Sequence, residues 1–257
     1  MGRCRGGACP SNHSEDKPRR VLRVGSWNVL SLSDDRRLSP LSGELSRLRV
    51  EIVGLSETRR TSSGETSRGG YTYYWSSMSN GDHVRGVAIG ISSKLQPSVV
   101  EVTPVDMGGI MGGIMRVRMK HTLGFMSLVA VYAPTEVRKT EEKEMFYAKL
   151  NSVLDQCPSW DTLIVLGDFN ATTGTVRNGY ELCVGPHGSS TRNTNSSLLL
   201  NFARSRRLRI VGSWYQRPEL HRWTLYSNAG GVAKEIDHVL ISTRWRILQN
   251  FRVYREC

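Results

Sequence analysis

One short stretch constrains the fold of this chain most strongly. It is the nearly uninterrupted apolar run Thr162–Gly167, which is followed at once by Asp168-Phe169-Asn170. A continuous apolar run, in contrast to an alternating one, is typical of a central strand that is covered on both faces. The 257 residues, of which 39% are hydrophobic, suffice for one large α/β domain with such a core. The run therefore predicts a layered α/β fold in which polar residues follow a buried strand.

Further strand and helix patterns surround this run. Apolar residues at helical spacing predict helices over about 41–51, 139–156 and 196–206. Short apolar or alternating runs between Gly and Ser clusters predict strands over about 21–27, 51–57, 71–75, 84–91, 98–103, 114–120, 125–132, 208–211, 222–226 and 236–241. The order gives two mixed halves without an internal repeat, which predicts two packed sheets with helices outside.

The chain divides into a tail and one domain. Residues 1–20 are polar and rich in Gly and Arg, which predicts a disordered basic tail before a domain over 21–257. We find neither a secretory signal nor an apolar run of the roughly 20 residues that cross a bilayer. We therefore expect an intracellular monomer, more readily nuclear than cytoplasmic, with no membrane partner. The formal net charge of +12 favours a polyanionic partner such as nucleic acid.

Polar side chains stand where the predicted strands end or are interrupted. These residues are Asn28, Glu57, Tyr132, Asp168, Asn170 and Asp237. Because clefts of α/β folds form where strands end, we expect these side chains to converge although they are far apart in sequence.

The chemistry of this set fits the cleavage of a phosphate ester. Glu57 and Asp168 offer hard oxygen ligands, which suit Mg²⁺, and Mg²⁺ can polarise a phosphoryl oxygen. Asn28 and Asn170 can bind the phosphate without adding negative charge, and Tyr132 can donate its phenolic proton. In extended backbone, Asp168 and Asn170 would face the same side.

Five short motifs follow one another along the chain. They are Ser26-Trp27-Asn28-Val29, Leu55-Ser56-Glu57-Thr58-Arg59, Val131-Tyr132-Ala133-Pro134, Gly167-Asp168-Phe169-Asn170 and Ile236-Asp237-His238-Val239-Leu240. Each motif alone is weak, but the five together resemble, in order, the motifs of the endonuclease/exonuclease/phosphatase superfamily. The resemblance runs from about Val21 to Arg246 and implies a four-layered α/β sandwich.

Four other stretches are similar to one branch, the endonuclease domains of non-LTR retrotransposons and the related craniofacial development protein 2-like group. They are Gly185–Gly188, Leu198–Ala203, Arg222–Ser227 and Lys234–Asp237. This resemblance implies a nuclease that nicks DNA with Mg²⁺, or with Mn²⁺ in its place. Carried over residue by residue, it assigns metal binding to Glu57, Asp168 and Asn170. The catalytic set becomes Asp168, Asn170, Tyr132, Asp237 and Asn28, and Thr224 contacts the substrate phosphate.

The sequence departs from the superfamily pattern at one point. The superfamily ends with a strand preceded by a Ser-Asp-His motif, whose His contacts the scissile phosphate, and no such motif follows Asp237. Asp237-His238 is no substitute, because neighbours on a strand face opposite sides. Losing an acid–base group commonly lowers a rate about 10²–10⁴-fold. We therefore expect a domain truncated at the C-terminus, without the final strand, and a weak or inactive nuclease.

Two other functions stay open at this point. A catalytically dead, domesticated copy would bind nucleic acid or chromatin without cutting. An inositol-polyphosphate phosphatase-like enzyme would share the superfamily chemistry and suit the basic charge. Arg204, Arg206, Arg207 and Arg209 form a basic cluster, which is either a solvated face or a phosphate-binding surface with salt-sensitive affinity. Of these, we expect Arg204, Arg206 and Arg207 to contact DNA.

Overall fold

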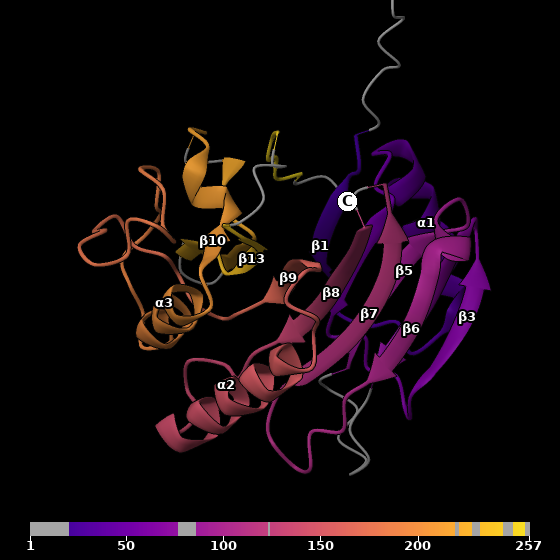
Figure 1. Ribbon diagram of the computed structural model, residues 1–257, viewed down its shortest axis with the longest axis horizontal. Coiled ribbons are helices and arrows are strands. Elements are labelled where there is room, and N and C mark those ends of the chain that lie inside the picture. The colour runs from indigo at the N-terminus through magenta and orange to yellow at the C-terminus, as the bar shows by residue number, and fades with distance from the viewer. Residues whose placement is uncertain are drawn as a thin grey trace, which may run out of the picture.

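Two sheets stand face to face, with helices on their outer sides (Figure 1). This computed structural model describes residues 21–76, 86–122, 124–218, 221–227, 232–243 and 249–254. The tail predicted over 1–20 lies outside the described residues, as do the first residues of the strand predicted over 84–91.

The first sheet has five strands in the order β1-β2-β5-β4-β3. They are β1 (Val24–Asn28), β2 (Ile52–Ser56), β3 (Gly64–Arg68), β4 (Tyr71–Ser76) and β5 (Val87–Ser92). β1 and β2 are parallel, and the other neighbours are antiparallel. Among the described strands, β1 pairs with β2 alone, so β1 forms one edge of this sheet.

The second sheet has six strands in the order β10-β13-β9-β8-β7-β6. They are β6 (Val99–Pro104), β7 (Gly113–His121), β8 (Gly124–Tyr132), β9 (Thr162–Asp168), β10 (Leu208–Ile210) and β13 (Asp237–Ser242). β8 and β9 are parallel, and the other neighbours are antiparallel. A small hairpin of β11 (Leu225–Ser227) and β12 (Val232–Lys234) precedes β13.

Among the described residues, three α-helices cover the sheets. They are α1 (Leu38–Arg47), α2 (Thr140–Asp155) and α3 (Ser196–Ser205), and single 3-10 turns lie at Asp35–Arg37, Gln96–Ser98 and Val211–Trp214. In the part of the chain that the structure describes, none of these helices has the length and apolarity that a bilayer crossing requires.

The core is divided by the sheets into three apolar layers. α1 packs Leu38, Leu41 and Leu45 on the outer face of the first sheet. A second layer fills the space between the sheets, and α2 and α3 cover the outer face of the second sheet. β9 sends Leu166 into the middle layer and Val165 into the helical layer, so it is buried on both faces as predicted. The predicted four-layered α/β sandwich is therefore confirmed.

Two strands were not predicted, and their composition explains why. β3 has the polar sequence Gly-Glu-Thr-Ser-Arg and is half exposed at the far edge of its sheet, so no apolar alternation marks it. β12 has three residues, too few for a pattern. The strand predicted over 222–226 begins only at Leu225, because Arg222 and Thr224 hold tertiary hydrogen bonds instead.

Gly167 is required by the close approach of β8 to β9. Its φ is +146°, and a Cβ at this position would overlap the carbonyl oxygen of Val131 on β8. We expect Gly167→Ala to destabilise the fold by about 3 kcal/mol or more, since backbone overlap adds to left-handed strain. Urea unfolding followed by circular dichroism measures this loss.

Gly70→Ala is the matched control for that experiment. Gly70 also has a positive φ, +83°, but nothing lies within 4 Å of its Cβ position. Only conformational strain of about 1–2 kcal/mol is expected there. Equal unfolding midpoints for the two variants would show that the overlap with β8 carries no energetic weight.

Candidate active site

The central strand β9 ends between two other candidate residues. Asp168, its last residue, lies in register with Tyr132 on β8 and with Asp237 on β13. These three polar residues thus stand side by side at one end of the second sheet. The prediction that polar residues at strand ends converge is therefore confirmed for Tyr132, Asp168 and Asp237.

Asn28 connects the first sheet to this position. It is the last residue of β1, and its Nδ2 donates to Glu57 Oε1 at 2.9 Å and lies 3.5 Å from Asp168 Oδ2. Glu57 directly follows β2 and has a φ of +56°, which few residues other than glycine adopt. Arg59 Nη2 lies 3.6 Å from Glu57 Oε2. The carboxylates of Glu57 and Asp168, which belong to different sheets, therefore both contact the side-chain amide of Asn28.

The prediction that Asp168 and Asn170 face one side of an extended backbone is wrong. β9 ends at Asp168, and Asn170 adopts a φ of +48°. Its backbone N–H donates to Asp168 Oδ1 at 2.8 Å, and its side-chain Nδ2 donates to Ala133 O at 2.9 Å. Asp side chains readily accept from the backbone two residues on, which turns the chain at this point. The turn brings Asn170 beside Asp168.

The local electrostatics disfavour the ionised acids. Burial, followed by the charge of Asp237, raises the pKa of Asp168 well above its ordinary value. Burial also raises the pKa of Asp237 to about 6, with a smaller increase from Glu57. Asp237 Oδ1 is buried and has no hydrogen-bond partner. A buried carboxylate oxygen without a donor, beside other acids, is suited to a cation.

The carboxylate and amide oxygens are ligands that suit a hard divalent ion. The acidic side chains of this site, however, are not close enough together to surround one. Among the described residues, no three acidic, histidine or cysteine side chains are grouped tightly enough to hold a metal. The Asn28 amide stands between Glu57 and Asp168, which explains part of this separation. Glu57, Asp168 and the Asn170 amide oxygen are the groups of the predicted set that could bind such an ion.

His238 faces away from the acids, as expected for the neighbour of Asp237 on a strand. It is buried, and its Nε2 lies 2.7 Å from Ala171 O. Burial lowers the pKa of this imidazole, so it is neutral at physiological pH. Its ring packs near Phe169, with 6.1 Å between ring centroids. His238 is thus a core residue behind the site.

Thr224 contacts the backbone of the site. Its Oγ1 accepts from Ile236 N at 3.0 Å and from Asp237 N at 3.1 Å, and its side chain is exposed. Against the larger increase from burial, a side-chain hydrogen bond between Thr224 and Asp237 also lowers the pKa of Asp237. Thr224 therefore fixes the start of β13, and its predicted contact with a phosphate stays a prediction.

Tyr132 is packed in the core between the sheets. It lines a small cavity of about 150 Å³ with Met111, Pro134 and Arg138. Its place beside Asp168 in the register agrees with a role in the site, and donation of its hydroxyl to a phosphate stays a prediction.

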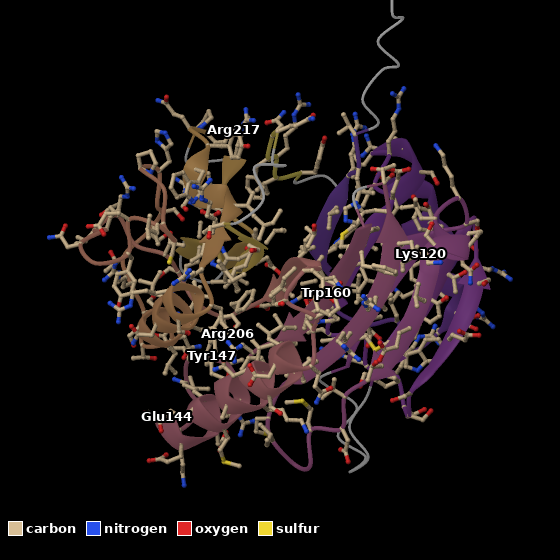
Figure 2. All side chains as sticks on the ribbon, in the orientation of Figure 1. Lys120, Glu144, Tyr147, Trp160, Arg206 and Arg217 are labelled. Atoms are coloured by element: carbon tan, nitrogen blue, oxygen red, sulfur yellow. The ribbon has the colours of Figure 1, made fainter. Side chains whose placement is uncertain are left out.

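The basic cluster near the end of α3 is held by contacts within the protein. Arg206 pairs with Asp155 at 2.6 Å and donates to Asn151 at the junction of α2 and α3 (Figure 2). Arg204 stacks on Tyr180, 5.0 Å from the ring centroid, and Arg207 has a φ of +52°. Arg206 is therefore neutralised by a carboxylate, whereas Arg204 stays exposed. DNA contact by these arginines remains a prediction.

Two site neighbours were missed from the sequence. Asn193 and Asn195 donate their side-chain amides to Asn170 O at 2.8 and 3.0 Å. An Asn just before a helix is a known start signal, and Asn195 does precede α3. Nothing local signals its second contact, 25 residues back along the chain.

Comparison with known proteins places this geometry in a family. The model of the Endonuclease/Exonuclease/phosphatase family matches residues 25–254. The chain belongs to this family. Craniofacial development protein 2 of Bos taurus is 27% identical over 224 residues, which cover 87% of this chain and 36% of that protein. The protein of the same name from Tragulus javanicus is also 27% identical over 224 residues, 87% of this chain and 37% of the relative. The chain thus spans little more than a third of these curated relatives.

Solved structures share the fold of this family member. The endonuclease domain of TRAS1, a telomere-specific non-LTR retrotransposon, superposes with a TM-score of 0.59 at 15% identity, covering 86% of this chain and 85% of that one. The 3′ phosphatase NExo from Neisseria, bound to a product DNA hairpin, gives 0.60 at 18% identity, with 86% and 87% covered. The resemblance read from the five motifs is confirmed at the level of the family.

Proposed function

We propose that this chain is a Mg²⁺-dependent DNA endonuclease of retrotransposon origin, with Mn²⁺ able to replace Mg²⁺. The observation that carries the proposal is the buried Asp168, flanked by Asp237 and by the Asn28–Glu57 pair. DNA as the substrate is supported by the net charge of +12 and by a fold neighbour, the 3′ phosphatase NExo, which is bound to a product DNA hairpin. Within this proposal the protein works in the nucleus, as a monomer.

The residues suggest distinct roles in hydrolysis of a phosphodiester. A divalent ion held by Glu57 and Asp168, with Asn170, would supply charge to polarise the phosphoryl oxygen. Asp168, buried at the end of β9 beside Asp237, is the proposed base that accepts a proton from the attacking water. Asn28 and Asn170 orient the phosphate with neutral groups, and Tyr132 and Thr224 donate to its oxygens.

One observation favours a second candidate function. The 257 residues contain no Ser-Asp-His motif, and His238 points away from the acids. Without such a histidine, these 257 residues could bind DNA or chromatin and cut it poorly. We therefore propose a low intrinsic nicking rate, with DNA binding without cutting as its limiting case.

Supercoiled plasmid separates these functions. We expect slow conversion to the open circle in Mg²⁺ or Mn²⁺ and none with excess EDTA, because the acids cannot act on a phosphate without a cation to offset their charge. Retention of the plasmid on a gel without nicking would support the binding protein. Release of phosphate from inositol polyphosphates, with no effect on DNA, would instead assign the chain to the phosphatases of the family.

A further inference from the structure

Two asparagine side chains hold the backbone carbonyl of Asn170. Asn193 Nδ2 and Asn195 Nδ2 both donate to Asn170 O, at 2.8 and 3.0 Å. Asn170 lies at a φ of +48°, a region that a non-glycine residue adopts at a cost. The two donors therefore stabilise a backbone conformation that a free turn would hold only part of the time.

Asn195 also reaches the turn that follows β8. The same Nδ2 donates to Pro134 O at 3.0 Å, so one amide group connects the turn after Tyr132 with the turn after Asp168. Ala133 N donates to Asp168 O at 2.8 Å across the same gap. The ends of β8 and β9 are thereby fixed relative to each other.

The support behind these donors is rigid. Asn195 is 2% exposed and precedes α3, whose Leu199 and Leu200 are fully buried in the helical layer of the core. Asn193 is itself held, because its Oδ1 accepts from Ser196 Oγ at 2.8 Å. Side chains that are locked by packing and by further hydrogen bonds can hold a reactive group to within a fraction of an ångström.

We infer that Asn195, with Asn193 beside it, is a positioning residue that acts through Asn170. It keeps the Asn170 amide and the Asp168 carboxylate at the spacing that phosphodiester hydrolysis needs. This role rests on the proposed function. A misplacement of about 1 Å in such a group can cost roughly 10²-fold in rate.

Asn195→Asp tests this role most sharply. It preserves the shape of the side chain but replaces the donating NH₂ with an oxygen, which faces the carbonyls of Pro134 and Asn170. We expect kcat for plasmid nicking to fall by about 10²-fold, with KM for DNA nearly unchanged. Asn195→Ser should lower kcat in the same direction without adding a charge, and Ser also favours the start of a helix.

Asn201→Asp is the matched control on the same helix. Asn201 is exposed, and its Oδ1 accepts from Tyr180 Oη and Arg204 Nη2, a role that a carboxylate keeps. Its kcat should equal that of the unmodified chain. A loss like that of Asn195→Asp would show that any added charge on α3 is harmful and would contradict the inference.

A double substitution distinguishes positioning from a general structural role. In an Asn170→Ala background, Asn195→Asp should lower kcat by clearly less than about 10²-fold, because the Asn170 side chain that Asn195 positions is already gone, although the backbone carbonyl of residue 170 remains. A full additional 10²-fold loss would mean that Asn195 acts by another route.

Amide hydrogen exchange tests the same coupling without nuclease activity. In metal-free protein, we expect the N–H groups of Asn170 and Ala133 to exchange at least about 10-fold faster in Asn195→Asp, and unchanged in Asn201→Asp. Unchanged exchange in Asn195→Asp would refute the inference even if the protein cuts DNA. Faster exchange in a protein that never cuts DNA would uphold the coupling and reject the proposed function.

Discussion

Asp168→Asn will abolish metal-dependent nicking and will also make the metal-free protein more stable. Asp168 is 3% exposed and lies beside two other acids, so its charge is poorly solvated. Removing that charge relieves the cost of ionising a buried carboxylate, and each unit by which burial raises a pKa corresponds to about 1.4 kcal/mol, so we expect a gain on the order of 1 kcal/mol or more. The same change removes a metal ligand and the proposed base, which we expect to lower nicking by at least about 10³-fold.

The gain in unfolding stability from Asp168→Asn should increase with pH, because the unmodified chain loses stability as its buried acids ionise. The folded-state pKa values of Asp168 and Asp237 are raised, so the folded protein binds more protons than the unfolded chain above about pH 4. The associated stability is fully present below pH 4 and is lost as pH rises, for Asp237 through about pH 6. Urea midpoints in EDTA should therefore fall between pH 5 and 8, and fall less in Asp168→Asn.

Asp106→Asn is the control for this pair of measurements. Asp106 is exposed, and its Oδ1 accepts from Gly108 N, which an asparagine can also do. It removes one exposed negative charge from a basic protein, at a position that follows β6, which β7 and β8 separate from β9, so no gain in stability is expected. Added Mg²⁺ at pH 8 should stabilise the unmodified chain and Asp106→Asn, but not Asp168→Asn. Lower stability of Asp168→Asn in EDTA would contradict the argument.

Much of this site was predictable because its signals are local. The apolar run Thr162–Gly167 identifies a strand buried on both faces, and the residue after such a strand lies at an edge where a cleft can form. Asn28, Asp168 and Asp237 sit at such ends and do come together. No local pattern shows that the strand ends of the two sheets meet at one site. The five motifs, because they occur in the order of the family, supplied that information.

The remainder depended on contacts between distant residues. The Asn170 turn is fixed by Asn193 and Asn195, which are 23 and 25 residues further along the chain, and no spacing rule connects them. β3 pairs with β4 through its backbone, which the polar side chains of β3 do not reveal. The arginines near α3 form a cluster in the sequence, but Arg206 is already paired with Asp155. Local charge density therefore did not indicate which cations are free to bind a phosphate.

A groove beside β1 is the basis of the second prediction, an increase in the nicking rate. β1 has one described partner, and a groove of about 1970 Å³ runs between it and β13. Ser26 Oγ on β1 is buried without a hydrogen-bond partner. Asn28 and Asp237 line the same groove, as do Phe251 and Tyr254 of the C-terminal segment. A further strand paired with β1 would therefore end near the acids.

We expect a chain extended by a strand that carries Ser-Asp-His to nick plasmid about 10²–10⁴-fold faster than the 257-residue chain, because the strand would supply an acid–base group near the acids. The control carries the same strand with Ala in place of Asp and His. It should raise the unfolding midpoint by pairing the edge of β1, yet leave the slow rate unchanged. If both extended chains nicked faster, the slow rate of the 257-residue chain would result from the unpaired edge of β1. Equal rates in all three chains would mean that Asp168 and its neighbours need no histidine, because the acids and the metal then complete the reaction on their own.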